Sequence, residues 1–181
     1  METKNNIYLS TDLKFNSVTD IDGFLKIEGY GAHYGVVNLN NEIVDKNSFN
    51  EFFGMYNDGK ITPKLNWNHD GDQIIGTIDD IISDNTGLYF TCSINKDVKI
   101  CQENLIPNIE KGVIDSFSTE GFIKNGYDGV IINSDGSYYV KDFILTALAV
   151  CAVGADYNAK FRLANFLKSE ETRRNKWYML M

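Results

Sequence analysis

The chain has few of the residues that build metal sites, disulfide frameworks or membrane spans. Its 181 residues include only two histidines, three cysteines and two prolines. The cysteines, at positions 92, 101 and 151, are odd in number, widely spaced and match no metal-binding pattern, so we expect buried thiols in a reducing compartment. No apolar run reaches the ~20 residues that a bilayer span needs, and residues 1–6 lack the apolar core of a signal peptide. These absences predict a soluble protein of the cytosolic type, with no membrane partner.

Basic residues are also scarce relative to acidic ones. The chain has 17 lysines and arginines against 25 aspartates and glutamates, a formal net charge of −8. A nucleic-acid-binding surface must be cationic to displace counterions, so direct DNA or RNA binding is disfavoured. What the chain does have is 43% hydrophobic and 13% aromatic residues. This composition and length predict one folded domain with a substantial core.

Strand-like segments dominate the first two thirds of the chain, separated by turn-forming residues. The expected strands cover about residues 23–37, 62–68, 74–82, 88–94, 113–124, 130–132, 138–140 and 143–153. Glycines at 29, 31 and 35 suggest a bend or bulge in the first of these strands. A short helix is expected after the capping residues 45–48, and a second over about 96–111, kinked or split at Pro107. The fold class predicted is α+β, a mostly antiparallel, barrel-like sheet with two or three flanking helices.

The expected organisation is a single main domain with two short flanking segments. An N-terminal edge segment covers residues 1–22, and the main domain covers residues 23–161. A C-terminal helix, starting near Ala159, and a charged tail occupy residues 162–181.

One serine and one histidine draw attention as a catalytic pair. His69 ends the apolar segment 65–70, and Ser118 lies in the expected strand 113–124. A serine hydroxyl becomes a good nucleophile when a neutral imidazole takes its proton, and the chain offers only His33 and His69 as bases. Other interpretations stay open on spacing alone. A histidine near a strand end is more often structural than catalytic, and residues 116 and 119 offer neighbouring hydroxyls.

The remaining polar motifs point to structural roles. Asp70-Gly71-Asp72 lacks the spaced oxygen ligands and distal glutamate of a calcium loop, so it is interpreted as a turn. No metal or other cofactor is expected. His33, in a glycine-flanked segment, is interpreted as structural or adjacent to a substrate.

Several segments, in order, resemble the tailed-phage prohead (capsid maturation) serine protease family, whose fold resembles the herpesvirus assemblin proteases. The segment from Leu65 to Asp70, followed by Ile75-Gly76, is similar to the family's histidine strand. Phe117-Ser118-Thr119-Glu120-Gly121-Phe122 is similar to its serine strand. The resemblance spans about residues 23–161. The other matching segments are 28–37, 42–49, 87–89, 111–114 and 145–159.

The resemblance implies a role for each residue of the pair. Ser118 takes the family position of the nucleophile, and His69 that of the general base. Family members often carry an acidic residue in the closing strand, where this chain has Ala147 and Ala149. Asp142, just before that strand, is the candidate for the third catalytic residue, with His33 a weaker one.

The resemblance also implies a biological role. A serine endopeptidase of this kind acts inside the procapsid in the host cell cytoplasm, cleaving the scaffolding protein, the major capsid protein and often itself. Members of the wider clan dimerise, which suggests a homodimer. Two alternatives stay open. One is a catalytically inactive homologue that serves as a structural or scaffolding component of the capsid, and the other is an unrelated β-barrel binding module in which His69 and Ser118 lie far apart.

Overall fold

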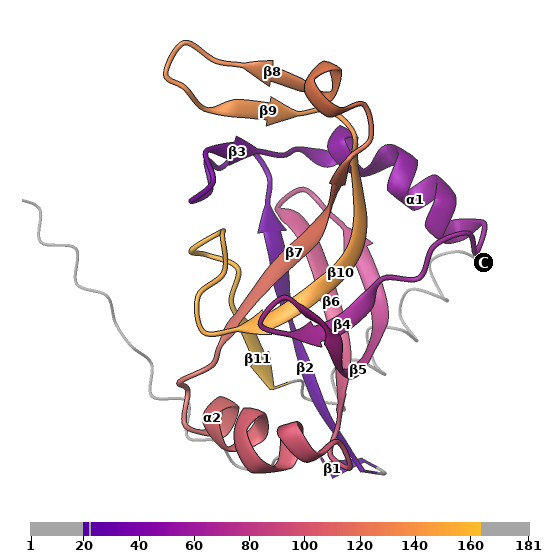
Figure 1. Ribbon diagram of the computed structural model, residues 1–181, viewed down its shortest axis with the longest axis vertical. Coiled ribbons are helices and arrows are strands. Elements are labelled where there is room, and N and C mark those ends of the chain that lie inside the picture. Colours follow the sequence, from indigo (N-terminus) through magenta and orange to yellow (C-terminus); the bar gives the residue numbers. More distant parts are fainter. Residues whose placement is uncertain (1–19, 22, 164–181) are drawn as a thin grey trace, which may run out of the picture.

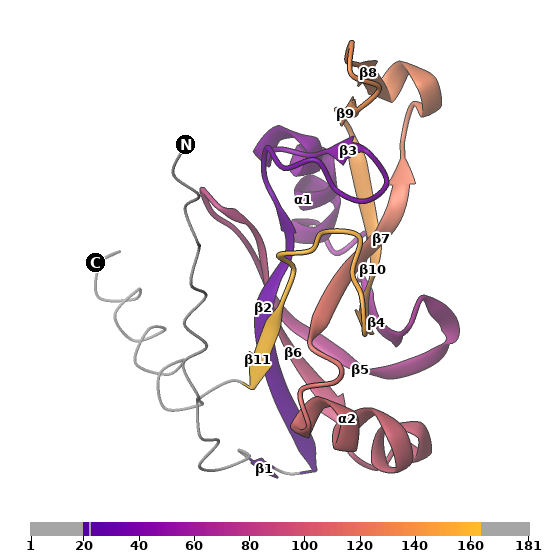
Figure 2. The same cartoon turned by 90° about the vertical axis from the view of Figure 1, so that its left-hand side faces the viewer.

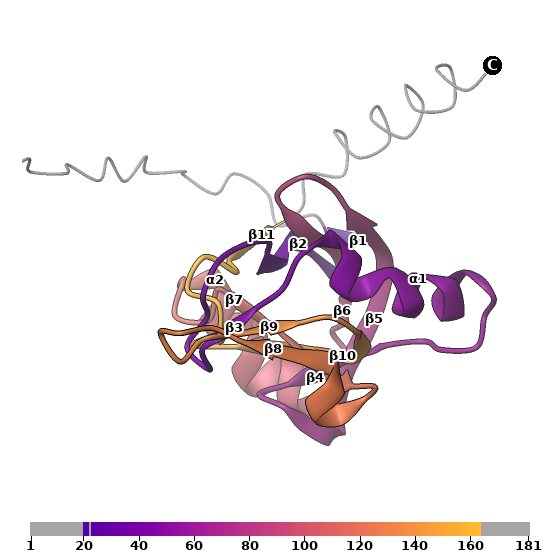
Figure 3. The ribbon, with the colours of Figure 1, turned by 90° about the horizontal axis from the view of Figure 1, so that it is seen from above.

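The computed structural model describes residues 20–21 and 23–163, which form one α+β domain around a curled sheet (Figure 1). The strand order is β1-β2-β6-β5-β4-β10-β7, and β11 pairs with β2. Seen from above in Figure 3, the strands wrap round into a half-barrel. The strands of this sheet are Asp20–Ile21 (β1), Phe24–His33 (β2), Lys64–Trp67 (β4), Asp70–Ser83 (β5), Gly87–Asn95 (β6), Ser116–Ile123 (β7), Phe143–Cys151 (β10) and Phe161–Leu163 (β11).

The sheet is mixed, which corrects the prediction of a mostly antiparallel one. β10 runs parallel to β4 on one side and antiparallel to β7 on the other. Alternation of apolar and polar residues shows where a strand lies but not which distant strand it pairs with. The parallel pair joins segments that are far apart in the sequence, so no local turn signal marks it.

A smaller three-stranded sheet, with order β3-β9-β8, packs at the top of the molecule (Figure 1). It contains the predicted hairpin, whose turn is closed by the Asn133 N–H donating to the Ser137 carbonyl oxygen at 2.8 Å. Figure 2 shows this hairpin projecting beyond the main sheet. Its strands are Glu42–Ile43 (β3), Val130–Ile132 (β8) and Tyr138–Val140 (β9).

The first predicted helix is confirmed, with its capping group. A 3₁₀ turn (η1, Lys46–Phe49) leads into α1 (Asn50–Asn57). The Asp45 side chain accepts from the Ser48 N–H, and the Ser48 hydroxyl oxygen accepts from the Asp45 N–H, a reciprocal capping box. Ser48 also donates to the Val140 carbonyl oxygen at 2.6 Å, which ties the helix start to β9.

The second predicted helix is present and is split as expected near Pro107. A π-helical turn (η2, Cys101–Leu105) precedes α2 (Ile106–Glu110), and the proline stands in the first turn of α2. Proline has no N–H to donate, so it is tolerated at a helix start but interrupts a continuous α-helix. A further 3₁₀ turn, η3, spans Gly126–Gly129.

The C-terminal part of the described chain differs from the prediction. We expected a helix from about residue 159, but Phe161–Leu163 forms β11, antiparallel to β2. The aromatic ring of Phe161 packs on that of Phe117 at a centroid distance of 4.9 Å, and Gly29 leaves room for the Lys160 backbone. This non-local packing favours the strand. The charged tail and most of the edge segment 1–22 lie outside the described residues.

The core lies inside the curled sheet and confirms the apolar face of the predicted strands of that sheet, whereas Ile131 and Ile132 of the predicted strand 130–132 are exposed. The bulge predicted near Gly31 is present as a register shift between Tyr30 and Ala32 in the β2–β6 pairing. All three cysteines are buried and free, as expected. The largest buried core side chains include Leu25, Ile27, Phe49, Phe52, Leu65, Phe90, Phe117 and Ile144.

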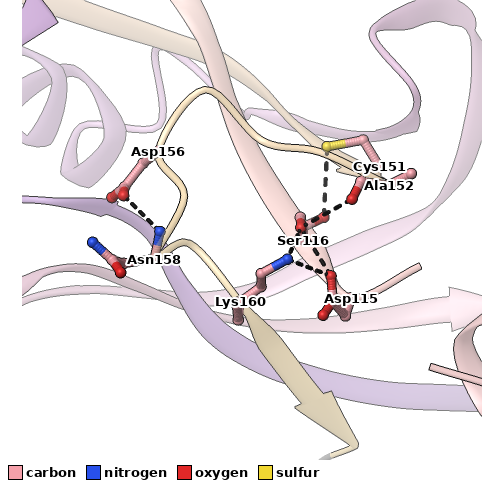
Figure 4. A network of polar contacts seen from close by, with 7 residues as sticks. All are labelled: Asp115, Ser116, Cys151, Ala152, Asp156, Asn158 and Lys160. Atoms are coloured by element: carbon pink, nitrogen blue, oxygen red, sulfur yellow. Dashed lines mark hydrogen bonds and ion pairs between the residues drawn. The ribbon is translucent and has the colours of Figure 1, made fainter. Parts of the chain in front are cut away.

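The start of β7 is joined to the start of β11 by hydrogen bonds and an ion pair, and we call this junction the seam of the half-barrel (Figure 4). Across it, the Phe117 N–H donates to Ala159 O at 2.8 Å, and the Phe161 N–H donates to Asp115 O at 2.9 Å. The Lys160 ammonium contacts the Asp115 carboxylate at 2.6 Å and the Ser116 hydroxyl at 2.8 Å. Farther along β7, beyond this seam, a cavity of about 580 Å³ lies between β7 and the end of β2.

Candidate active site

Three neighbouring strands bring the predicted catalytic segments together. Asn66 in β4 pairs with Ala149 in β10, and Ala149 pairs with Ser118 in β7, so these residues form one row across the sheet. Glu120 lies two residues after Ser118 and therefore on the same face, which we call the site face. The opposite face of the same strands is core, with Leu65, Leu148, Phe117 and Val150.

His69 is held in a strained hairpin turn. Trp67 pairs with Asp70, so Asn68 and His69 form a two-residue connection between β4 and β5, and their φ values are 54° and 63°. Two positive φ angles are typical of a type I′ hairpin turn, which favours asparagine or glycine. Histidine in this conformation is costly, and such strain persists where the surroundings enforce it, often at functional sites. The Asn68 N–H, which donates to Val150 O at 3.0 Å, fixes the turn against β10.

The imidazole of His69 contacts a carboxylate. Nδ1 of His69 lies 3.2 Å from Oε1 of Glu120, and the same oxygen accepts a hydrogen bond from Nδ2 of Asn66 at 2.6 Å. An ionised carboxylate only accepts hydrogen bonds, so it favours the tautomer with the proton on Nδ1. Nε2 then keeps its lone pair and can act as a base.

Asn66 is a buried side chain whose amide nitrogen donates to Glu120 while its amide oxygen has no hydrogen-bond partner among the described residues. Its side chain is 1% exposed, and its Oδ1 accepts no hydrogen bond from any described residue. A buried polar atom left without a partner costs roughly 1–3 kcal/mol. The other end of the amide, Nδ2, donates a hydrogen bond to Oε1 of Glu120.

Ser118 lies on the wall of a cavity that His69 also lines. Both residues line the cavity of about 580 Å³, together with Thr119, Glu120 and Gly121. Ser118 is 3% exposed, and in the described part of the chain its hydroxyl takes part in no side-chain hydrogen bond. A hydroxyl beside a cavity and without an internal partner is available to a bound substrate.

The structure distinguishes Ser118 from the two neighbouring hydroxyls. The Ser116 hydroxyl is engaged by Asp115, Lys160 and the Ala152 carbonyl oxygen, and Ser116 does not line the cavity (Figure 4). Thr119 does line it, but Thr119 pairs with Leu148, on the opposite face of β7 from Glu120.

Asp142, the predicted third residue, is not brought to this site. It precedes β10 at the end remote from Ala149, and its carboxylate contacts Nδ2 of Asn125 at 3.4 Å. It does not line the cavity. The assignment of Asp142 as the partner of His69 therefore loses its geometric basis, because a side chain before the strand faces the η3 turn rather than the β4–β5 hairpin.

His33 forms a second histidine–carboxylate pair on the cavity wall. Nδ1 of His33 lies 2.7 Å from Oδ2 of Asp156, which also accepts from the His33 backbone N–H at 2.8 Å. Oδ1 of Asp156 accepts from the Asn158 N–H at 2.9 Å. This pair connects β2 to the loop after β10, where Gly154 is required because a Cβ would lie 2.2 Å from the Phe117 carbonyl oxygen.

Sequence reasoning missed Glu120, Asn66 and Asp156. A signal existed for Glu120, since residues 118 and 120 of an expected strand share a face. The contacts of Asn66 depend on the pairing of β4 with β10, and those of Asp156 depend on how the loop after β10 packs against β2. The sequence carries no local signal for either.

The cysteines do not offer a competing nucleophile. Burial raises the pKa of the Cys101 and Cys151 thiols to about 11, and raises the pKa of the Cys92 thiol well above its usual range. A thiol is nucleophilic as its thiolate, so these groups stay protonated and inert near neutral pH. In the stretch that the structure describes, no group of His, Cys, Asp and Glu side chains could hold a metal ion.

Comparison with known families shows to which family the chain belongs. Residues 11–170 match the family described as caudovirus prohead serine protease. The chain belongs to this family. It is a serine peptidase of capsid maturation, and prohead proteases of this family are located in the phage capsid. No helix among residues 20–21 and 23–163 is long and apolar enough to cross a membrane.

Solved structures of similar shape are also viral proteases. The bacteriophage T4 capsid assembly protease, gp21, has a TM-score of 0.55 and 21% identity, over 70% of this chain and 80% of that one. The KSHV protease in complex with a hexapeptide phosphonate inhibitor has a TM-score of 0.54 and 11% identity, over 83% of this chain and 69% of that one. At these identities the likeness concerns the fold, and it confirms the predicted assemblin-like architecture. No curated protein sequence matches this prohead protease.

Proposed function

We propose that this prohead protease is an endopeptidase that uses Ser118 as nucleophile and His69 as general base. Its substrates are the scaffolding protein and the major capsid protein inside the procapsid, and the chain itself. The observation that carries the proposal is that Ser118 in β7 and His69 in the β4–β5 turn line one cavity on either side of β10, with Nδ1 of the imidazole in contact with Glu120.

In the first step, Nε2 of His69 takes the proton of Ser118 as Oγ attacks the scissile carbonyl carbon. Collapse of the tetrahedral intermediate breaks the C–N bond, and the imidazolium gives its proton to the leaving amine. Water, activated by the same imidazole, then hydrolyses the acyl-enzyme and restores the Ser118 hydroxyl.

The edge of β7 is suited to binding an extended peptide. β7 is the last strand in the order of the sheet, and beyond its seam with Lys160 its free edge faces the cavity along Thr119–Gly121. An exposed strand edge binds a peptide by adding a strand, with backbone hydrogen bonds that do not depend on sequence. This geometry supports cleavage within an extended segment of a capsid or scaffolding protein.

The direct test is a comparison of Ser118→Ala with Ser116→Ala. Each purified variant is incubated with the major capsid and scaffolding proteins of the same phage, and products are resolved by gel and N-terminal sequencing. We expect Ser118→Ala to cleave neither protein while Ser116→Ala, if folded, still cuts. Cleavage by Ser118→Ala would overturn the assignment.

Covalent labelling separates the protease from an inactive homologue. A fluorescent fluorophosphonate reacts with an activated serine and should label the wild-type protein but not Ser118→Ala. A wild-type protein that unfolds cooperatively yet takes up no label would favour the structural role instead.

A further inference from the structure

We propose that Glu120, anchored by Asn66, is the residue that positions His69 for catalysis. This inference rests on the proposed function, because it concerns the same serine and histidine. It places the orienting carboxylate on the serine strand, two residues after the nucleophile, rather than on the closing strand or at Asp142.

The contacts of Glu120 fit this role. Its Oε1 lies 3.2 Å from Nδ1 of His69 and 2.6 Å from Nδ2 of Asn66. The second contact comes from a side chain that is itself 1% exposed, so the carboxylate is held by a fixed donor rather than by solvent. Glu120 is half-buried at the cavity wall, where it can stabilise the charge that develops on the imidazole.

Other nearby carboxylates are occupied elsewhere. Asp70, next to His69 in the chain, accepts from Gln73 Nε2 at 2.6 Å and from the Asp72 N–H at 3.0 Å. Asp156 is paired with His33. Among the described residues, Glu120 is the carboxylate in contact with His69.

The two alanines of the closing strand explain how Glu120 reaches across the sheet. β10 lies between β7 and β4, with Ala147 opposite Glu120 and Ala149 opposite both Ser118 and Asn66. Cβ is the largest side-chain group at these two positions, so it leaves open the space above β10. The Glu120 side chain crosses that space to meet Asn66 and His69. The positions that resemble those of the family's acidic residue thus make room for a carboxylate from the adjoining strand.

During the reaction Glu120 exchanges no proton. As the Ser118 O–H bond breaks and the Oγ–C bond forms, the proton moves to Nε2 of His69. Nδ1 keeps its hydrogen, and its contact with Oε1 of Glu120 at 3.2 Å places the carboxylate beside the imidazolium until the proton passes to the leaving amine. Glu120 is therefore a positioning residue.

The experiment compares Glu120→Gln with Glu103→Gln, a control on the η2 turn whose carboxylate pairs with Lys99. The readouts are the second-order rate of fluorophosphonate labelling, and kcat and KM for a peptide that spans a mapped capsid cleavage site. For Glu120→Gln we expect a loss of kcat on the order of 10³-fold, with KM and the unfolding temperature unchanged. Glu103→Gln should match wild type.

A double-mutant cycle with His69→Ala distinguishes positioning from a structural role. If Glu120 acts through His69, then adding Glu120→Gln to His69→Ala changes the residual labelling rate less than about twofold. A wild-type rate for Glu120→Gln, or an equal loss in both backgrounds, would overturn the inference. Failure of the proposed function looks different, since Ser118→Ala and His69→Ala would then keep activity.

Discussion

The two histidines of this chain sit in similar pairs with different surroundings. In both, Nδ1 faces a carboxylate on the wall of the same cavity, at 3.2 Å for His69–Glu120 and 2.7 Å for His33–Asp156. The side chains of the first pair are 43% and 26% exposed, whereas those of the second are 18% and 9% exposed. The same chemistry is thus accessible in one pair and enclosed in the other.

The surroundings assign a different task to each pair. Asp156 also binds two backbone N–H groups, so its pair fixes the loop after β10 to the end of β2. In the other pair, the backbone of His69 lies in a strained turn, and the Glu120 carboxylate accepts a hydrogen bond from one amide side chain, that of Asn66. A histidine–carboxylate contact alone therefore does not identify a catalytic base. Backbone strain and side-chain exposure separate the two pairs.

The largest expected effect is on activity, from exchanging each histidine for alanine. His69→Ala should lower kcat/KM by on the order of 10⁴-fold or more, because the base is lost. His33→Ala should lower it less than about tenfold, since it loosens a loop without removing a reacting group. Peptide hydrolysis and fluorophosphonate labelling measure both. Equal losses would abolish the distinction between the pairs.

For the free energy of unfolding we expect the reverse: loss of the His33–Asp156 pair should have a larger effect than loss of the His69–Glu120 pair. Asp156→Ala should lower the free energy of unfolding by roughly 2–4 kcal/mol, because the His33 imidazole and two backbone N–H groups lose their acceptor. Glu120→Ala should lower it by only about 1–2 kcal/mol, because the carboxylate itself is partly exposed although the buried Asn66 amide loses its acceptor. Urea denaturation at constant pH provides the measurement. A Glu120→Ala protein as unstable as Asp156→Ala would place the first pair in the structural class as well.

Asn66 should show opposite effects on stability and rate. In Asn66→Leu a side chain of similar size removes the orphaned oxygen together with the anchor of Glu120, so stability should stay level or rise by up to about 1 kcal/mol. Labelling of Ser118 should nevertheless slow by about tenfold or more, as the carboxylate loses its position. An Asn66→Leu protein that reacts at the wild-type rate would show that Glu120 needs no anchor.

The smallest effect concerns the strained turn. His69→Gly relieves the positive φ at a non-glycine residue and should raise the free energy of unfolding by about 0.5–1 kcal/mol while eliminating activity. Asn68→Gly is the matched control, because it relieves the neighbouring position and should retain activity. A His69→Gly protein less stable than wild type would show that the imidazole contributes more to the fold than the strain costs.

Much of this fold was predictable from patterns of residues close in the sequence. The features that were not predictable all depend on contacts between segments far apart in the sequence. The turns at 45–48 and 133–137, the split at Pro107 and the burial of the cysteines follow from residues close in sequence. The parallel β4–β10 pair, the β11 strand and the Asn66–Glu120 contact depend on which distant segments adjoin. Ser118 and His69 were found through resemblance to the prohead protease family. Asp142 was chosen for its position in the sequence, and the geometry does not support it.

The placement of β10 has a consequence for when proteolysis can begin. This late strand separates the hairpin that carries His69 from the strand that carries Ser118, and its backbone fixes both. A chain still emerging from the ribosome, with residues 143–163 not yet made, lacks the strand that joins the His69 hairpin to the Ser118 strand. We therefore expect proteolysis by the proposed pair to begin only after the whole domain has been synthesised and folded.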